Sequence, residues 1–191
     1  MKIIGIAGTD GSGKDSLGHY LRDEFGWYFM SVTDLLREEA KVRGMRLSRS
    51  TLKIISAEWR AKEGLGVLIN HAVKEYESLK NKYKGLCVAS LRNPGEADRV
   101  HELGGKVVWL DAPIKLRYQR AIARNKGAED QITFEEFQKE GAIQMHGPAD
   151  ETALNLSAVK AKADLFITNN SNDFGEFHIR SKQALAEYLK P

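Results

Sequence analysis

A short run of residues near the N-terminus has the glycine and lysine spacing of a loop that binds phosphate groups. Glycines at positions 8, 11 and 13 permit backbone angles that other residues rarely adopt, so successive N–H groups can point inward. Lys14 adds a full positive charge where the β- and γ-phosphates of a nucleoside triphosphate would lie. We therefore expect phosphate binding by eight residues of this run: Gly8, Asp10, Gly11, Ser12, Gly13, Lys14, Asp15 and Ser16.

The residue after the lysine departs from the usual pattern of such loops. That position normally holds a Ser or Thr whose hydroxyl binds Mg²⁺, and here it holds Asp15. A carboxylate is a good magnesium ligand, although it adds negative charge beside the phosphates. Ser16 offers a hydroxyl one residue later, but an α-helix turns that residue about 100° away. The sequence therefore favours Asp15 as the magnesium ligand, directly or through water.

The elements on either side of the loop support this interpretation. Residues 3–7 form a short apolar run typical of a buried strand, and residues 14–25 carry apolar side chains at helical spacing. A helix that begins at the end of such a loop adds a partial positive charge facing the same space. The strand, loop and helix together predict a phosphate site rather than a plain glycine-rich turn.

Further short apolar runs alternate with helical patterns along the whole chain. We expect strands over residues 27–32, 86–90, 106–110 and 164–168, separated by helices. The helices are expected from residue 33 onward and over 50–62, 67–83, 113–124 and 174–189, with two more opening at Asn93 and Thr133. This alternation predicts an α/β fold in three layers, a five-stranded parallel sheet flanked by helices on both faces.

The order of elements predicts one domain over residues 1–191 with two attachments. The core takes about residues 1–32 and 85–191, and a helical insertion takes about 33–84. That insertion can reach over the carboxyl edge of the sheet, where ligands bind in such folds. Polar residues 125–131 lie within a lid region of about 124–150, which could close over the site and exclude water.

Composition excludes several classes of partner and compartment. The net charge of +3 is too small to predict a nucleic-acid partner, so phosphate binding must depend on individually placed side chains. Cys87 is the single cysteine, which excludes an internal disulfide and suits a reducing cytosol. No apolar run approaches the roughly 20 residues of a membrane span. We expect a cytoplasmic protein with neither membrane nor nucleic-acid partner, and leave its oligomeric state open.

A second motif follows the predicted strand at 27–32. The string Thr-Asp-Leu-Leu-Arg-Glu-Glu, residues 33–39, resembles the start of the acceptor-binding helix in adenylate-kinase-like nucleoside monophosphate kinases. In that family the arginine at this point grips the phosphate of the acceptor. The resemblance therefore implies that Asp34 and Arg37 belong to an acceptor site. It also implies a similar role for Arg92, which directly follows the strand at 86–90.

Two later segments are similar to dephospho-CoA kinases. Residues 107–113, followed by arginines at 117, 120 and 124, resemble the fourth strand and the helix before the lid in that family. Residues 164–170 resemble its final strand, whose following loop lies near the adenine. This likeness implies Arg120 and Asn169 on the adenine side. The string at 34–44, the stretch at 133–136 and the order of elements also resemble uncharacterised archaeal P-loop kinases.

These resemblances imply an ATP-dependent phosphotransferase with Mg²⁺ as cofactor. Phosphoryl transfer depends mainly on positioning and on stabilising the charge of the moving group, which explains why basic residues would gather. Arg120 and Arg124 lie one helical turn apart and can face the same site. The catalytic candidates are Lys14, Arg37, Arg120 and Arg124, and the expected acceptor is a small nucleotide, foremost a nucleoside or deoxynucleoside monophosphate. Dephospho-CoA is the alternative acceptor.

The end of the predicted third strand lacks an acidic residue, and this absence leaves an alternative function open. Many relatives place an aspartate near the end of the third strand for magnesium, but this chain has Val88-Ala89-Ser90 there. Asp10, Asp15 or Asp111 could replace it, and Asp10 also resembles an acid of thymidylate kinases that lies near the acceptor sugar. The gap favours, as an alternative, a nucleotide-binding switch or slow NTPase without a small acceptor. The tryptophans and Cys87 are predicted to be core residues.

Overall fold

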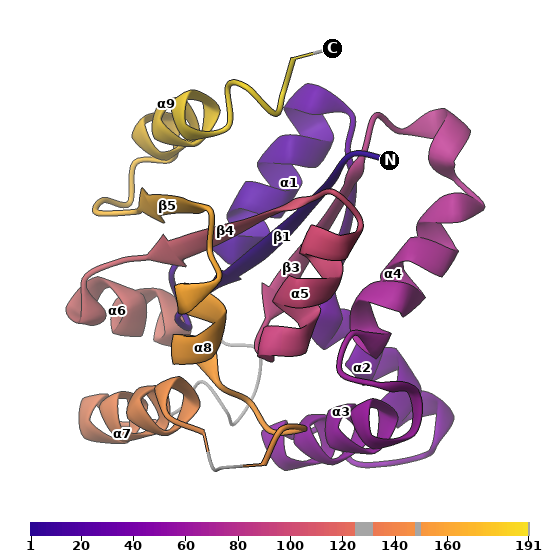
Figure 1. The fold of residues 1–191 in the computed structure, drawn as a ribbon. Helices are drawn as coiled ribbons and strands as arrows, with labels where there is room; N and C mark the ends of the chain where they lie inside the picture. The colour runs from indigo at the N-terminus through magenta and orange to yellow at the C-terminus, as the bar shows by residue number, and fades with distance from the viewer. Residues whose placement is uncertain (125–131, 148–149, 191) are drawn as a thin grey trace.

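The computed structural model describes residues 1–124, 132–147 and 150–190, and within them a parallel sheet forms the centre of the molecule (Figure 1). The strands lie in the order β2-β3-β1-β4-β5, and each neighbouring pair is parallel. The prediction of a five-stranded parallel sheet flanked by helices is confirmed. The strands are β1 (Ile3–Gly8), β2 (Tyr28–Ser31), β3 (Leu86–Leu91), β4 (Lys106–Asp111) and β5 (Leu165–Thr168).

Helices fill most of the connections between these strands. Three expectations are corrected: the predicted helix over 67–83 ends at Glu77, the predicted helix over 174–189 ends at Ala184, and a short helix forms before β5 where the sequence predicts none. That short helix has six residues, too few to show a helical period in the sequence. The helices are α1 (Lys14–Phe25), α2 (Val32–Val42), α3 (Arg49–Glu63), α4 (Val67–Glu77), η1 (Lys80–Lys82), α5 (Pro94–Glu102), α6 (Ile114–Arg124), α7 (Phe134–Met145), α8 (Leu156–Ala161) and α9 (Phe174–Ala184).

Both faces of the sheet are buried, which explains why the strand sequences are apolar without a break. In β3, Leu86 and Val88 pack with the side chains of α4, α5 and α8, whereas Cys87 and Ala89 pack with those of α1 and α9. The alternation follows from the strand period of two. The result is three layers, with α1 and α9 on one face and α4, α5 and α8 on the other (Figure 1).

Two helices begin where their capping residues predict. Asn93 and Glu96 form a reciprocal capping box at the start of α5, with Pro94 in the first turn. Thr133 and Glu136 form the same arrangement at the start of α7. Each box satisfies backbone N–H groups that a helix end would leave unpaired. Both predicted helix starts are therefore confirmed.

The carboxyl edge of the sheet is covered by elements that come from distant parts of the chain. Helices α3 and α7 lie beyond this edge (Figure 1), and the loop between β1 and α1 faces them. The pairing of β1 with β3 shifts register here, because Ile6 pairs with Ala89 and Ala7 pairs with Leu91. Ser90 is the extra residue of this bulge and takes a φ of 72°. The bulge places Ser90 in the wall of a cavity at this edge.

The residues predicted as core are buried. Trp27 and Trp109 are each 2% exposed, and Trp59 stacks on His71 with 4.6 Å between the ring centroids. Cys87 is fully buried, and burial raises the pKa of its thiol. None of the helices in the described ranges combines the length and the apolar character that crossing a membrane requires.

Candidate functional site

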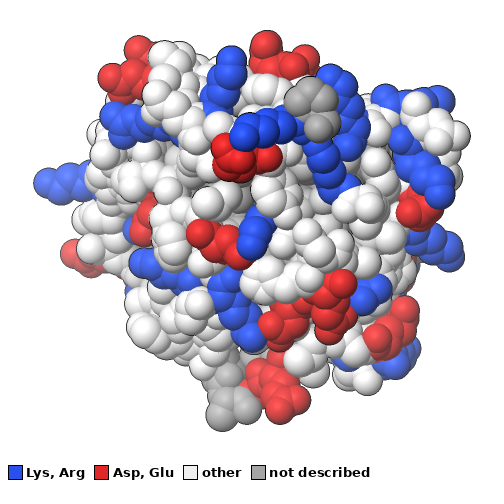
Figure 2. Space-filling view, turned by 45° about the horizontal axis from the view of Figure 1, so that its top comes forward, with Lys and Arg blue, Asp and Glu red and all other residues white. Residues whose placement is uncertain are grey.

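A cavity of about 850 Å³ opens at the carboxyl edge of the sheet, within the size range of small-ligand sites. Its walls come from the β1–α1 loop, the starts of α1 and α2, helices α3, α6 and α7, and residues after β5. Several basic side chains line it, whereas the face in Figure 2 has basic and acidic residues interspersed. Any charge selectivity of this cavity therefore comes from local placement, as the small net charge predicts.

The β1–α1 loop has the backbone conformation that only glycine tolerates well. Gly11 has a φ of +75° and Gly13 a φ of +103°, both in the left-handed region. A Cβ added to Gly11 would lie 2.4 Å from the backbone oxygen of Arg117 in α6. The glycine therefore permits both the turn of the loop and its close approach to α6.

Side chains outside the loop hold it in this shape. The Thr9 hydroxyl donates to Asp111 at the end of β4 over 2.8 Å. The Asn169 amide nitrogen donates to the Ser12 carbonyl over 3.0 Å, and the Asn169 backbone N–H donates to the Asp111 carbonyl. Asp111 does not line the large cavity, so the idea that it replaces the missing magnesium acid has no support in this geometry.

Lys14 is the first residue of α1, and its buried side chain reaches back to the loop. Its ammonium donates to the Thr9 carbonyl over 2.8 Å, and the residue is 7% exposed. Burial lowers the pKa of Lys14 to about 8, against the opposing attraction of Asp10. A lysine with a perturbed pKa that lines a cavity is a candidate for a binding or catalytic role.

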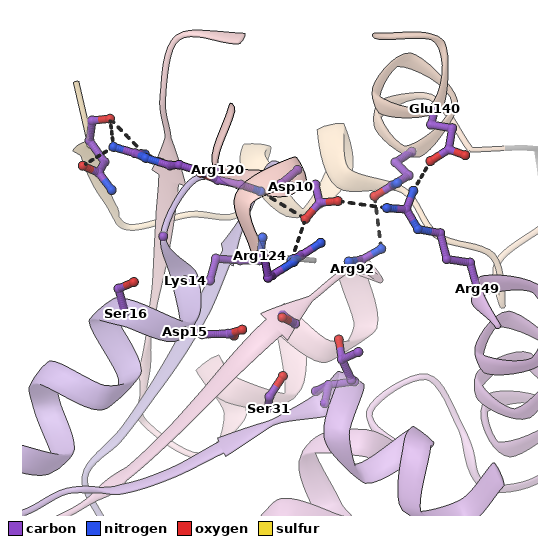
Figure 3. Close-up of a pocket in the computed structure, with 18 of the residues that line it drawn as sticks. Asp10, Lys14, Asp15, Ser16, Ser31, Arg49, Arg92, Arg120, Arg124 and Glu140 are labelled. Carbon is purple, nitrogen blue, oxygen red and sulfur yellow. Dashed lines mark hydrogen bonds and ion pairs between the residues drawn. The ribbon is translucent and has the colours of Figure 1, made fainter. Parts of the chain in front are cut away.

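Asp10 is surrounded by basic groups from four directions (Figure 3). Its carboxylate lies 3.4 Å from the Arg124 guanidinium and 3.3 Å from that of Arg49. Burial alone would raise the pKa of Asp10, but the charges of Lys14, Arg124, Arg92 and Arg49 outweigh it and lower that pKa to about 2. Asp10 is therefore a stable anion that orients the neighbouring guanidinium groups.

Asp15 lies on the cavity side of α1 and points towards the ends of β2 and β3 (Figure 3). Ser16 projects from a different side of the helix, as the 100° turn per residue predicts. Ser31 and Ser90 line the same cavity. A carboxylate with hydroxyls and room for water suits Mg²⁺, which retains several waters in proteins. Within the described ranges, no cluster of three or more His, Cys, Asp or Glu side chains could hold a metal alone.

Arg120 connects the loop to the segment after β5. Its guanidinium donates to the Asn172 side chain over 3.0 Å, to the Asn169 side chain over 3.2 Å and to the Gly11 carbonyl over 3.4 Å. Both ends of the Asn169 amide are thus bound within the protein. The structure brings the two predicted adenine-side residues together, and their contact with adenine remains a prediction.

Of the two residues predicted from the motif at 33–39, one lines the cavity and the other does not. Arg37 lines it from the second turn of α2, with a side chain 25% exposed. Asp34 lies outside the cavity, and its 65% exposed carboxylate accepts from Arg37 over 2.9 Å. Any effect of Asp34 on an acceptor would therefore be exerted through the orientation of Arg37.

Arg92 is held at the β3–α5 junction by a buried network. Its backbone N–H donates to Glu96 over 2.7 Å, and the other Glu96 oxygen accepts from Arg60 over 2.6 Å. The Arg92 guanidinium donates to the Gln144 side chain over 3.1 Å. Burial lowers the pKa of Arg92 from its usual high value, and the residue stays charged.

Several cavity residues were not predicted from the sequence. Arg49 begins α3 and binds Asp10, 39 positions earlier, and Glu140 of α7 on its other side. Arg60 of α3 and Gln144 of α7 reach the same cavity. Contacts over such separations have no local pattern, so only the fold could reveal them. The polar residues 125–131, expected to close as part of the lid, lie outside the described residues.

No family model matches the chain, but curated archaeal proteins are similar to it. A UPF0200/UPF0201 protein of Archaeoglobus fulgidus is 25% identical over 193 residues, and the chain spans only 57% of that relative's length. The UPF0200 protein of Pyrococcus abyssi is 28% identical over 174 residues, 89% of this chain and 88% of the relative. That of Sulfurisphaera tokodaii is 28% identical over 194 residues, 99% of this chain and 98% of the relative.

Solved structures share the fold over nearly the whole chain. Shikimate kinase from Acinetobacter baumannii in complex with shikimate aligns with a TM-score of 0.57 at 17% identity, covering 98% of this chain and 95% of that one. A protein of Thermus thermophilus aligns with a TM-score of 0.60 at 20% identity, covering 99% and 98%. These likenesses establish a P-loop kinase-like fold. The closer resemblance to adenylate and dephospho-CoA kinases stays a prediction.

Proposed function

We propose that this protein transfers the γ-phosphate of ATP to the phosphate of a nucleoside or deoxynucleoside monophosphate. One observation carries the proposal: a single cavity is lined by the glycine-rich loop with Lys14 and also by the arginines 37, 92 and 124, which come from other elements. Two groups of phosphate-binding residues that face one space suit a donor phosphate and an acceptor phosphate. The kinase-like fold of the solved neighbours supports the same class of reaction.

The residues of the cavity divide this reaction between them. Backbone N–H groups of the loop and Lys14 bind the donor phosphates, while Arg37 and Arg92 bind the acceptor phosphate. Arg124 donates to Asp10 of the loop, a position from which it can stabilise the charge that develops on the moving group. Because catalysis of phosphoryl transfer is mostly positioning and electrostatics, this set needs no covalent intermediate.

The state of Asp10 favours a phosphate acceptor over a hydroxyl acceptor. A hydroxyl must lose its proton during transfer, which a general base with a pKa near neutrality assists best. The Asp10 pKa of about 2 makes this carboxylate a weak base, and both of its oxygens already accept from arginines. A monophosphate arrives already ionised, so it needs no such base.

Magnesium fits the geometry around Asp15. Asp15 would hold the ion directly or through water, with the hydroxyls of Ser31 and Ser90 as partners for its water ligands. When bound, the ion neutralises charge on the β- and γ-phosphate oxygens. Asp15 thus takes the place of both the loop hydroxyl and the absent acid at the end of β3.

An ADP-release assay with a panel of acceptors tests the proposal. The panel contains nucleoside and deoxynucleoside monophosphates, dephospho-CoA and shikimate, the last because a solved neighbour binds it. We expect at least one monophosphate to stimulate ADP release well above the rate without acceptor. The variant Arg37→Ala should lose that stimulation, whereas Arg43→Ala, an arginine just past the end of the same helix and bound to Glu39 and Glu58, should keep it.

A nucleotide-dependent switch is the second candidate, favoured by the serine at position 90. Ser90 stands in the cavity wall where many kinases of this kind place an acid, and it adopts a left-handed backbone conformation. A switch protein would bind ATP, hydrolyse it slowly and show no stimulation by any small acceptor. Unchanged activity in Arg37→Ala would favour this candidate over the kinase.

A further inference from the structure

Gln144 is a cavity residue that the proposed reaction leaves without a role. It lies in the last turn of α7 and is 8% exposed, whereas Gln138 in the same helix is exposed to solvent. A buried amide is costly unless its polar atoms are satisfied. The partners of its oxygen and its nitrogen therefore indicate its role.

The orientation of the Gln144 amide is fixed by chemistry. The partner of its oxygen is the Arg92 guanidinium, over 3.1 Å. A guanidinium can only donate hydrogen bonds, so the atom of Gln144 that faces it must be the oxygen. The amide nitrogen, with two N–H donors, must point elsewhere.

That nitrogen opens into the cavity. It has no hydrogen-bond partner among residues 1–124, 132–147 and 150–190. It is also absent from the set of sealed, unpartnered buried atoms in those ranges, which consists of Ser12 Oγ, Arg60 Nε, Trp109 Nε1 and Ser181 Oγ. Since Gln144 lines the cavity, its N–H groups are donors presented to whatever occupies the space beside Arg92.

We propose that Gln144 is a specificity-determining residue whose amide N–H groups donate to an oxygen of the acceptor beside Arg92. The inference rests on the proposed function, because Arg92 is there assigned to the acceptor phosphate. The required group is a hydrogen-bond-accepting oxygen, either on the acceptor phosphate or as a base carbonyl. An acceptor that lacks such an oxygen leaves the buried donors unpaired, which is the strongest form of discrimination by a polar site.

Two substitutions at position 144 separate the N–H donors of the amide from its hydrogen-bond-accepting oxygen. Gln144→Glu keeps an oxygen for Arg92 but removes both N–H donors, and Gln144→Met removes every polar atom at similar volume. Gln138→Glu is the matched control, because it makes the same change on the exposed side of α7. Binding of AMP, GMP, CMP and dTMP is measured by calorimetry, and turnover with ATP is measured alongside it.

Both variants at position 144 should raise the acceptor Kd and KM by about tenfold or more, the usual effect of losing a donor to a charged or buried oxygen. The KM for ATP should stay within about twofold of the wild-type value, which a general loss of structure would not allow. If the affinity for all four monophosphates falls equally, the partner of the Gln144 N–H groups is the acceptor phosphate. If the affinity falls for GMP, CMP and dTMP but not for AMP, the partner is a carbonyl of the base, because adenine has no carbonyl group.

The outcomes distinguish this inference from the proposed function. Unchanged acceptor affinity in Gln144→Met, with turnover intact, overturns the role of Gln144 and leaves the kinase proposal standing. Binding that depends on Gln144 without any phosphoryl transfer supports Gln144 and overturns the kinase proposal. A wild-type protein that binds none of the four monophosphates overturns both.

Discussion

The two sides of the cavity are built in different ways. The donor side is one continuous loop whose backbone makes the site, held by Thr9 and Asn169 in fixed hydrogen bonds. The acceptor side is assembled from single side chains of separate elements, among them Arg37, Arg92 and Gln144. The donor site is therefore encoded locally, and the acceptor site depends on how distant helices pack.

This difference has an energetic side. Backbone N–H groups in a braced loop are already oriented and lose little freedom when a phosphate binds. The acceptor side depends instead on long side chains such as Arg37, whose orientation comes from a partly exposed ion pair with Asp34. We expect substitutions on the donor side to abolish function and those on the acceptor side to change its specificity.

The largest effect should follow from Lys14→Met, which removes the charge of the donor side. The variant should lose about a hundredfold to a thousandfold in kcat/KM, as when other preorganised charge-stabilising donors are removed. Circular dichroism should show the same fold, and the melting temperature should not fall, because a buried ammonium is removed. Near-wild-type ADP release by this variant would place the reaction at another site.

Gly11→Ala tests whether the loop backbone is as tightly constrained as the structure indicates. The new Cβ would lie 2.4 Å from the Arg117 carbonyl oxygen, and the alanine would have to adopt a φ of +75°. Because both effects are unfavourable, we expect the free energy of unfolding to fall by about 2 kcal/mol or more. ATP affinity should fall with it. Gly44→Ala is the control, since its φ is +65° but nothing lies within 4 Å of the new Cβ. Equal destabilisation of the two variants would contradict the constraint by α6.

Arg92→Ala tests whether acceptor binding can be weakened without affecting ATP binding. The acceptor KM should rise by about tenfold to a hundredfold, the cost of one charge-assisted hydrogen bond, while the KM for ATP changes little. Arg99→Ala is the matched control, because Arg99 lies in α5 and binds Asn70 and Glu102 away from the cavity. A parallel rise in both KM values for Arg92→Ala would show that the two sides are not separable.

The smallest expected effect is a pH dependence confined to the donor side. With a pKa of about 8, Lys14 is charged below that pH and becomes neutral above it. ATP affinity should therefore be level up to about pH 7, fall by about half at pH 8 and decline further above, by at most tenfold per pH unit. Calorimetry on Lys14→Arg supplies the control, since a guanidinium stays charged in this range. The same decline in Lys14→Arg would assign it to another group.

The fold and the donor site can be predicted from the sequence because their determinants are local. Strand runs such as that of β3, the capping box at Asn93 and the spacing up to Lys14 each lie within a few residues. The end of α4 at Glu77 and the short helix α8 are not evident in the sequence, since they depend on tertiary packing rather than on periodicity.

The acceptor site can be predicted only in part, for a physical reason. Arg37 belongs to a motif, whereas Arg49 and Gln144 gain their roles from contacts 39 and 52 positions away. The bulge that turns Ser90 into the cavity arises from a register shift between two strands, which neither strand reveals alone. Side chains assembled by packing have no spacing rule in the sequence.

The most direct test of the central claim follows the fate of a labelled γ-phosphate. ATP carrying the label is incubated with the protein, magnesium and each monophosphate, and the products are separated. We expect the label to appear on a nucleoside diphosphate, and Arg37→Ala and Arg92→Ala to reduce the amount of this product. Label recovered only as inorganic phosphate, at a rate that no monophosphate changes, would contradict a kinase that holds donor and acceptor in one cavity.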